Sequence, residues 1–203
     1  MQEKRGRSKS EEKRQLIIQA AGELFVEHGF EKVSMEGIAK FAGVSKQTVY
    51  SHFGNKQQLF TAAIEAKCDE YTLVPEEQSR TMDCETYLTS FCTDLCSLLA
   101  SPEAIGILKA CIREDSNTEI GELFWAAGPS KITQRLSGYL HEQSQRGNLK
   151  FDNIEFATSQ LIAMIHSEAQ FRSLLCAGDT KPNNELADYA RSCVQVFLKA
   201  HKP

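Results

Sequence analysis

The sequence predicts an all-α protein, and three observations carry that prediction. Apolar residues recur at helical spacing along almost the whole chain, no stretch alternates with a period of two for long enough to indicate a strand, and Gly, Pro and Asn divide the chain into helix-sized segments. The 203 residues, 41% apolar and 25% charged, fit globular domains of ordinary composition and argue against a disordered or fibrous chain.

The first predicted helix runs from Ser10 to His28. Apolar residues follow the i, i+3, i+4, i+7 rule along it, as on one face of an amphipathic helix. Ser10 is a suitable cap, and the acidic Glu11 and Glu12 suit the positive end of the helix dipole. Gly29 favours the left-handed conformation that ends a helix.

Two short helices and a longer one follow. A short helix is predicted after Ser34, and another from Lys46 to His52, with a turn at Gly43-Val44-Ser45 between them. Asn55, with Gln58 three residues later, is a variant of the capping box and predicts the start of the longer fourth helix.

The rest of the chain is also predicted to be helical. The fourth helix should end near Pro75, since proline cannot continue a helix, and the polar segment 76–83 is expected to be a loop. Gly128-Pro129 should break or kink one long predicted helix. The further helices are predicted at 84–100, 103–114, 118–146, 154–177 and 184–200.

The two short helices match a helix-turn-helix pattern. Gly43 can adopt the positive φ of a tight turn, and Ala39 is small where the helices must cross closely. Ile38, Val44 and Val49 supply a shared core. The second helix then leaves polar residues free to enter a major groove: Lys46, Gln47, Thr48, Tyr50, Ser51 and His52. On this pattern alone, a plain αα-hairpin remains the alternative.

The residues around this pattern resemble the TetR/AcrR family of bacterial transcriptional regulators. The resemblance covers about the first 65 residues and is carried by many positions at the family's spacing: Ala20-Ala21, Leu24-Phe25, His28-Gly29-Phe30, Val33-Ser34-Met35, Ile38-Ala39, Ala42-Gly43-Val44-Ser45, Thr48-Val49-Tyr50-Ser51-His52-Phe53, Asn55-Lys56 and Leu59-Phe60. The segment Phe124-Trp125-Ala126-Ala127-Gly128-Pro129 is more loosely similar to the C-terminal domain of some members.

The resemblance implies a three-helix helix-turn-helix DNA-binding domain at 1–56, joined to a helical effector-binding and dimerisation domain at 57–203. It implies a homodimer that binds a palindromic operator, with half-site centres roughly 34–36 Å apart or somewhat farther. The cytoplasm is the expected compartment, because the charged first residues are not followed by an apolar stretch of signal-peptide type. A repressor released by a small apolar or amphipathic effector is the expected function. An activator, or a thiol redox-responsive regulator on the same scaffold, remains the alternative.

The resemblance also implies roles for individual residues. Lys46 and Gln47 are expected to contact base edges, whereas Arg5 and Arg7 in the N-terminal tail are expected to add a phosphate or minor-groove contact. Glu36 departs from the family, in which a groove-facing residue here is often neutral or basic. The expected phosphate contacts are Ser34, Ser45, Thr48, Tyr50, His52 and Lys56.

The C-terminal helices are expected to hold an effector and a second subunit. The expected effector-binding residues are Phe91, Leu95, Leu108, Ile112, Phe124, Trp125, Met164 and Ile165, with His166 and Glu168 as polar anchors. The last two helices carry apolar stripes suited to an intersubunit four-helix bundle: Leu161, Ile162, Ile165, Ala169, Leu186, Ala190, Val194 and Phe197. The alternative is that these stripes serve only the core of one subunit.

Charge and cysteine content narrow the function classes. The net charge is −4, but residues 1–56 hold 10 Lys and Arg against 7 Asp and Glu, while the remainder holds 13 against 20. The predicted DNA-binding part is therefore the basic part. Seven cysteines without a CxxC pattern favour neither a disulfide framework nor a zinc site.

Catalytic, cofactor and membrane functions are not expected from the sequence. His141-Glu142 begins like a zinc-protease motif, but Gln145 stands where the second His belongs. No nucleophile elbow, phosphate loop or dinucleotide fingerprint occurs. The apolar runs are shorter than the roughly 18 residues that a membrane span needs.

Overall fold

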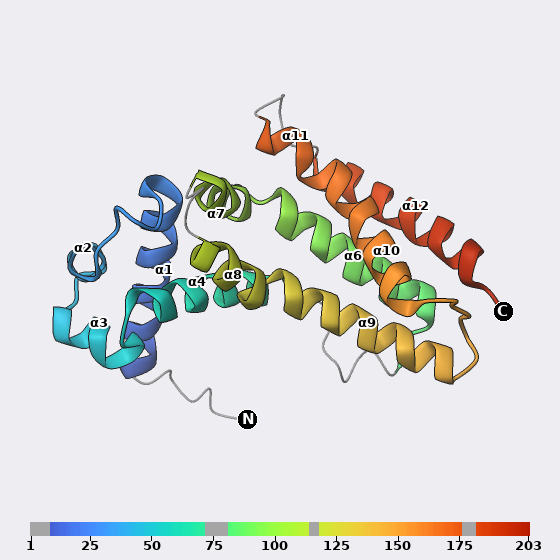
Figure 1. Cartoon of the computed structure of the whole chain (residues 1–203), viewed down its shortest axis with the longest axis horizontal. Coiled ribbons are helices and arrows are strands. Elements are labelled where there is room, and N and C mark those ends of the chain that lie inside the picture. Colours follow the sequence, from blue (N-terminus) through green and yellow to red (C-terminus); the bar gives the residue numbers. More distant parts are fainter. Residues whose placement is uncertain (1–8, 72–80, 114–117, 176–181) are drawn as a thin grey trace, which may run out of the picture. The chain divides into compact units, whose positions relative to one another are not determined.

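The computed structural model describes residues 9–71, 81–113, 118–175 and 182–203, and every regular element within these ranges is a helix (Figure 1). The all-α prediction is therefore confirmed. The chain folds into two compact units: unit 1 is Met1–Ala66 with Gly106–Ala127, and unit 2 is Lys67–Ile105 with Gly128–Pro203. Unit 1 thus takes in a segment from the middle of the chain besides the predicted DNA-binding segment 1–56.

Unit 1 contains the four predicted N-terminal helices. Its helices are α1 (Lys9–His28), α2 (Met35–Phe41), α3 (Lys46–Phe53), most of α4 (Lys56–Glu70), the later part of α7 (Pro102–Arg113) and α8 (Thr118–Ala127). The predicted cap Asn55 is confirmed, since its Oδ1 accepts from Gln58 N at 2.8 Å, and Ser34 Oγ accepts from Gly37 N at 3.0 Å. Short polar side chains therefore define where α2 and α4 begin. The predicted cap Ser10 is wrong, because it lies inside α1, which already includes Lys9.

The turn between α2 and α3 is as predicted. Gly43 has φ 67°, a left-handed conformation that a residue with a side chain adopts only with strain. The backbone N–H of Val44 donates to the carbonyl of Ala39 at 3.0 Å, which closes the turn.

An aromatic cluster and the helix-turn-helix residues form the core of unit 1. The rings of Phe25, Phe30 and Phe60 lie 5.2–5.7 Å apart between centroids, two of the three pairs being edge-to-face. Ile38 from α2 and Val49 from α3 are fully buried, so each short helix is anchored by its apolar face. The outer faces of α2 and α3 remain available.

Unit 2 is a helical bundle with its own core. Its helices are α6 (Cys84–Ala100), the start of α7, α9 (Pro129–Gln145), α10 (Ile154–Ala169), the short α11 (Phe171–Leu174) and α12 (Asn183–His201). Figure 1 shows α10 and α12 beside α6, and apolar residues of α6, α9, α10 and α12 share one buried cluster. In the described ranges no single helix is long and apolar enough to cross a membrane, although the broken pair α6 and α7 passes that test when taken together.

One predicted helix break is confirmed, and one helix predicted as continuous is broken. The break at Gly128-Pro129 is confirmed, because α8 ends at Ala127 and Pro129 occupies the first turn of α9. The continuous helix predicted at 154–177 is wrong, because α10 ends at Ala169 and the chain turns at Gln170 before α11. Gln170 is buried, and its side chain bonds that of His166, four residues earlier on α10. No proline or glycine marks this break in the sequence.

The apolar stripes of α10 and α12 correct one expectation. Leu161, Ile165, Leu186 and Val194 are all fully buried within the single chain, in the core of unit 2. The rest of the predicted intersubunit stripe is likewise in or against this core: Ile162, Ala169, Ala190 and Phe197. The buried members of the stripe therefore serve the core of one subunit, which is the alternative stated for them, and the prediction that they face a second subunit is wrong. Ile162 is only half-buried, and its contact with a second subunit stays a prediction.

Several sequence predictions lie outside the described residues. They are the tail contacts of Arg5 and Arg7, the helix end near Pro75 with the first part of the polar loop after it, and the last two residues of the helix predicted at 154–177.

Candidate nucleic-acid interface

Helix α3 packs against the core of unit 1 through one face and exposes the opposite face to solvent. Val49 and Phe53 are buried beneath it, whereas Lys46, Gln47 and Tyr50 are exposed, Tyr50 by 40%. The sequence dictates this division, because residues three and four apart share a helix face. The exposed face carries an ammonium, an amide and a phenol, which together offer donors and acceptors to base edges and phosphates.

The first turn of α3 is ordered by its own hydroxyl groups. Ser45 Oγ accepts from Thr48 N at 3.1 Å and lies 2.8 Å from Thr48 Oγ1, and Ser51 Oγ donates to the Thr48 carbonyl at 2.8 Å. Only one of the two hydroxyl hydrogens of Ser45 and Thr48 is used between them. The other is left to donate to an external acceptor such as a phosphate oxygen.

An ion pair links the outer faces of α2 and α3. The ammonium of Lys46 pairs with the carboxylate of Glu36 and lies 5.5 Å from the centre of the Tyr50 ring. The hydrogen bond from Lys46 lowers the pKa of Glu36, and the same bond raises the pKa of Lys46, so both groups stay ionised at neutral pH. The acidic residue that departs from the family pattern is thus the partner of a predicted base-contacting lysine.

Lys56 has a structural role that the sequence does not reveal. Its ammonium donates to the carbonyl oxygens of Phe30 at 2.9 Å and Glu31 at 3.4 Å, and it lies 4.2 Å from the centre of the Phe30 ring. These contacts hold the loop that leads into α2. A phosphate contact by Lys56 stays a prediction, and it would use the ammonium hydrogen that these two bonds leave over.

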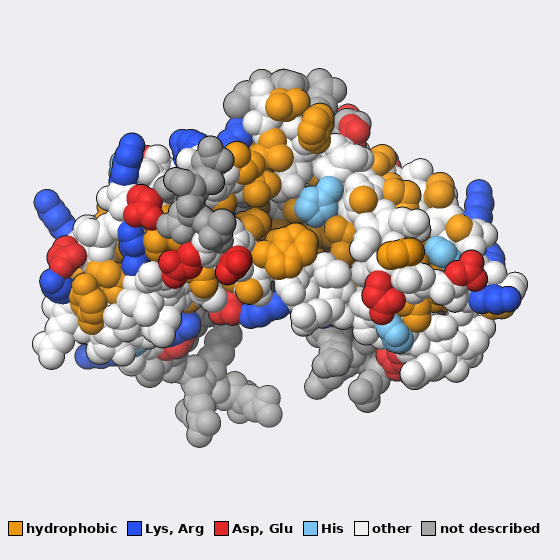
Figure 2. All heavy atoms as spheres, in the orientation of Figure 1, with side chains coloured by type: hydrophobic (Ala, Val, Ile, Leu, Met, Phe, Trp, Pro, Cys, Tyr) orange, Lys and Arg blue, Asp and Glu red, His pale blue; other side chains and the backbone are white. Residues whose placement is uncertain are grey.

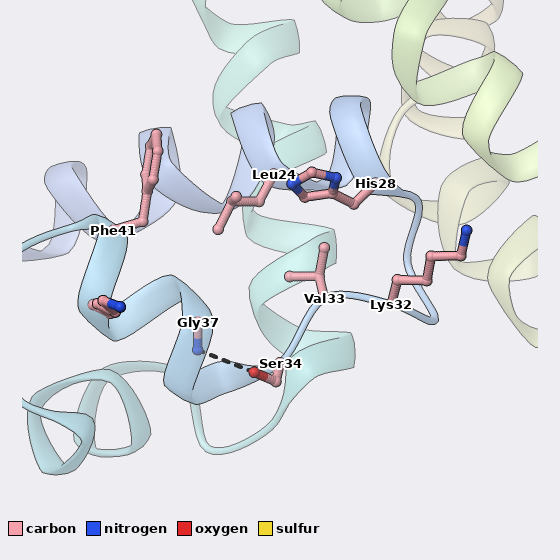
Figure 3. A pocket seen from close by; sticks show the side chains of 8 residues that line it. Leu24, His28, Lys32, Val33, Ser34, Gly37 and Phe41 are labelled. Atoms are coloured by element: carbon pink, nitrogen blue, oxygen red, sulfur yellow. Dashed lines mark hydrogen bonds between the residues drawn. The ribbon is translucent and has the colours of Figure 1, made fainter.

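A groove of about 530 Å³ lies between α1 and α2 (Figure 3). In Figure 3 Leu24 and His28 come from α1, while Gly37 and Phe41 come from α2 and Ser34 caps the latter helix. Lys32 and Lys40 also line the groove, and on the face seen in Figure 2 Lys and Arg side chains project from unit 1 at several points. Ser34, a predicted phosphate-contacting residue, therefore lines the same groove as two positively charged lysines.

The expected effector-binding residues are distributed over both units. In unit 2 Phe91, Leu95 and Ile165 are fully buried, and Met164 packs against the same core. In unit 1 Leu108 and Phe124 are half-buried, while Ile112 and Trp125 are 60% and 61% exposed. None of these eight lines the groove between α1 and α2, and their role toward a ligand stays a prediction.

The expected polar anchors lie on α10 of unit 2. His166 is half-buried, its Nδ1 is 3.1 Å from the Gln170 side-chain oxygen, and burial lowers the pKa of this histidine. Glu168 is half-buried. A largely neutral imidazole with one remaining ring nitrogen is a suitable polar contact for an uncharged ligand.

None of the described cysteines forms a disulfide, and the three in the core of unit 2 are poor nucleophiles. Cys92, Cys96 and Cys193 are buried. Burial raises the pKa of all three thiols, that of Cys96 to about 12. Because the thiolate is the reactive form, these three groups are poor redox sensors at neutral pH. Among the described cysteines, a redox response would have to use the half-buried Cys68, Cys84 or Cys111.

Comparisons with known proteins agree with this geometry. The family model of bacterial regulatory proteins, tetR family, matches residues 17–63, and that of the AefR-like transcriptional repressor C-terminal domain matches residues 86–203. The chain is 28% identical over 188 residues to YdeS of Bacillus subtilis (strain 168), an uncharacterised HTH-type transcriptional regulator, covering 93% of this chain and 91% of YdeS.

Solved structures agree over nearly the whole chain. A TetR transcriptional regulator from Agrobacterium tumefaciens has a TM-score of 0.74 and 26% identity, covering 93% of this chain and 94% of its own. The flavonoid-responsive regulator FrrA has a TM-score of 0.73 and 27% identity, covering 95% and 98%. Both the helix-turn-helix segment and the C-terminal helices thus have counterparts of known fold.

Proposed function

The chain belongs to the TetR family of bacterial transcriptional regulators, and from that premise we propose that it is a ligand-responsive repressor that binds a palindromic operator as a homodimer. Binding to chromosomal DNA places its action in the cytoplasm. A small apolar or amphipathic effector releases it by favouring a dimer whose recognition helices no longer match the operator spacing.

One observation carries the DNA-binding proposal: α3 is anchored through buried Val49 and Phe53 while Lys46, Gln47 and Tyr50 stand exposed on its outer face. A helix so presented fits a major groove. We assign base-edge contacts to Lys46 and Gln47, because their side chains project without serving the core. The phosphate contacts are assigned to Ser34, Ser45, Thr48, Tyr50, His52 and Lys56.

Selection of bound duplexes from a random DNA library tests this proposal. We expect the protein to enrich a two-fold symmetric sequence, with an affinity that falls steeply with salt because bound phosphates release counterions. Enrichment of sequences without symmetry would contradict a dimer with one recognition helix per half-site. Failure to enrich any sequence would contradict operator recognition itself.

The outward faces of α10 and α12 are the proposed dimer surface. Phe156 on α10 is 68% exposed and Val196 on α12 is 57% exposed, so each helix presents a large apolar side chain on its outward face. Lys150 N donates to the His201 carbonyl at 2.9 Å, which brings the start of α10 and the end of α12 together, so both side chains lie toward the same end. They replace the buried stripe as the candidates for contact with a second subunit.

Light scattering after size-exclusion chromatography tests the dimer surface. Phe156→Glu and Val196→Glu should each shift the protein toward the monomer, because a carboxylate would be buried in the interface. Leu16→Glu, at an exposed leucine of α1, is the matched control and should leave the mass unchanged. Unchanged mass for all three variants would place the interface elsewhere.

The effector proposal draws on the family and on one relative of the same fold. FrrA is described as flavonoid-responsive, and the apolar residues expected to line a pocket in this chain suit a molecule with a large apolar surface. Trp125 is the only tryptophan in the sequence, so its fluorescence reports ligand binding near α8. A ligand that saturates this signal without weakening operator binding would contradict release by that ligand.

A further inference from the structure

The ion pair between Glu36 and Lys46 places a hydrogen-bond acceptor beside a hydrogen-bond donor on the protein surface. The two residues come from different helices, α2 and α3, and both side chains are more than half exposed. Lys46 is the first residue of α3, and its ammonium lies over the ring of Tyr50, one turn later on the exposed face. A donor and an acceptor therefore stand next to each other on the surface that is proposed to meet DNA.

This arrangement is complementary to one orientation of a G·C base pair. In the major groove guanine shows two acceptors, N7 and O6, and cytosine shows the N4 amino donor beside guanine O6. An ammonium next to a carboxylate therefore matches guanine O6 next to cytosine N4. The side chains that are in contact with each other in the free protein already have the order of groups that the base pair requires.

We propose that Lys46 and Glu36 together read one G·C pair in each half-site, with Lys46 Nζ donating to guanine O6 and N7 and Glu36 accepting from cytosine N4. The inference rests on the proposed DNA binding and deepens it. It gives the acidic residue, which on electrostatic grounds alone should repel a phosphate-lined groove, a specific role in sequence recognition.

The same chemistry disfavours the other three base pairs. In C·G and A·T the central amino and carbonyl groups have exchanged places relative to G·C, so an amino group meets the lysine and a carbonyl meets the carboxylate. T·A keeps the correct central groups, but it puts a methyl group where guanine N7 would meet Lys46 and puts adenine N7, an acceptor, beside Glu36. Only G·C satisfies both side chains.

Symmetric operators that differ only at the position read by this pair test the proposal. The position is identified first by library selection with wild-type protein, and affinities for all four base pairs are then measured by fluorescence anisotropy at one salt concentration. Wild type should prefer G·C by roughly 5- to 100-fold, the discrimination of a good paired contact to a base pair.

Two variants give opposite and specific changes. Glu36→Gln should move the preference toward T·A, because a glutamine amide both donates and accepts and so matches adenine N6 and N7. The charge-swapped double variant Glu36→Lys with Lys46→Glu should move it toward C·G, because donor and acceptor have exchanged places. Glu142→Gln removes an exposed ion pair with Arg146 in unit 2 and is the matched control, which should keep the wild-type preference.

The outcomes separate this inference from the function on which it rests. If Glu36→Gln binds every operator more tightly by the same factor, with its base preference unchanged, Glu36 only repels phosphate and the inference is overturned while operator binding stands. If wild-type protein enriches no DNA sequence at all, the proposed function fails and the inference with it.

Discussion

Gly106 on α7 lies so close to Val26 on α1 that it has no room for a side chain. A Cβ atom at Gly106 would stand 2.4 Å from Val26 Cγ1 and 3.2–3.3 Å from Cγ2 and Cβ, whereas carbon atoms in ordinary contact are about 3.5–4.0 Å apart. Gly106→Ala must therefore push α7 away from α1 or force Val26 out of its rotamer. We expect the substitution to loosen the packing within unit 1.

The magnitude follows from two opposing effects. An added methyl group in a tight contact costs about 1–3 kcal/mol, while alanine in place of glycine within a helix gains about 1 kcal/mol. Gly121→Ala on α8 is the matched control, because its Cβ would meet nothing within 4 Å and only the gain applies. The two alanine variants should therefore differ in free energy of unfolding by about 1–3 kcal/mol, Gly121→Ala being the more stable.

Urea denaturation followed by circular dichroism measures this difference, at one protein concentration because dimerisation contributes to stability. Val26→Ala in the Gly106→Ala background should restore part of the loss, a favourable coupling of at least about 0.5 kcal/mol. If Gly106→Ala stabilises the protein as much as Gly121→Ala does, the close approach of α7 to α1 is refuted.

Three further predictions concern single groups. Lys56→Met should lower the free energy of unfolding by about 1–2 kcal/mol in urea denaturation, since it removes the charged donor to the Phe30 carbonyl; equal stability would contradict that role. Burial lowers the pKa of His166 from its ordinary 6.5, so stability is fully present above pH 6.5 and falls as pH drops below it. His166→Gln should flatten that pH dependence, and an unchanged slope would point to other groups. Mild peroxide should not act through Cys92 and Cys96, because both are buried thiols of raised pKa; an oxidant-sensitive operator affinity that is lost in Cys92→Ser or Cys96→Ser would contradict this.

The helix boundaries could be predicted where local chemistry sets them. Ser34 and Asn55 cap the helices that follow, and Gly43 adopts the positive φ that the tight turn requires. The break at Gly128-Pro129 follows from the missing N–H and fixed φ of proline. By contrast, α10 ends at Ala169 with no proline or glycine to mark the break, and the apolar spacing continues past it, so the sequence predicts one continuous helix there.

The sequence predicts which face of α3 is exposed, but only some of the contacts that individual side chains make. Val49 is the apolar residue in the middle of α3, so it indicates which side of this helix is buried and therefore which side is exposed. The bond from Lys56 to Phe30 spans 26 residues and has no local signal. Periodicity likewise marks Leu161 and Val194 as buried without telling whether their neighbours belong to the same subunit, and here they do.

The central claim is that the exposed face of α3 reads DNA sequence, and selection from a random library with wild type and Gln47→Ala tests it most directly. Gln47 is exposed and takes no part in the cap of α3, so its replacement should not disturb the helix. The loss of its side chain should erase base preference at one symmetric pair of operator positions and leave the other positions unchanged. Gln145→Ala, at an exposed glutamine that ends α9, is the matched control and should select the wild-type sequence. Identical preferences at every position for wild type, Gln47→Ala and the control would contradict the assignment of α3 as the recognition helix.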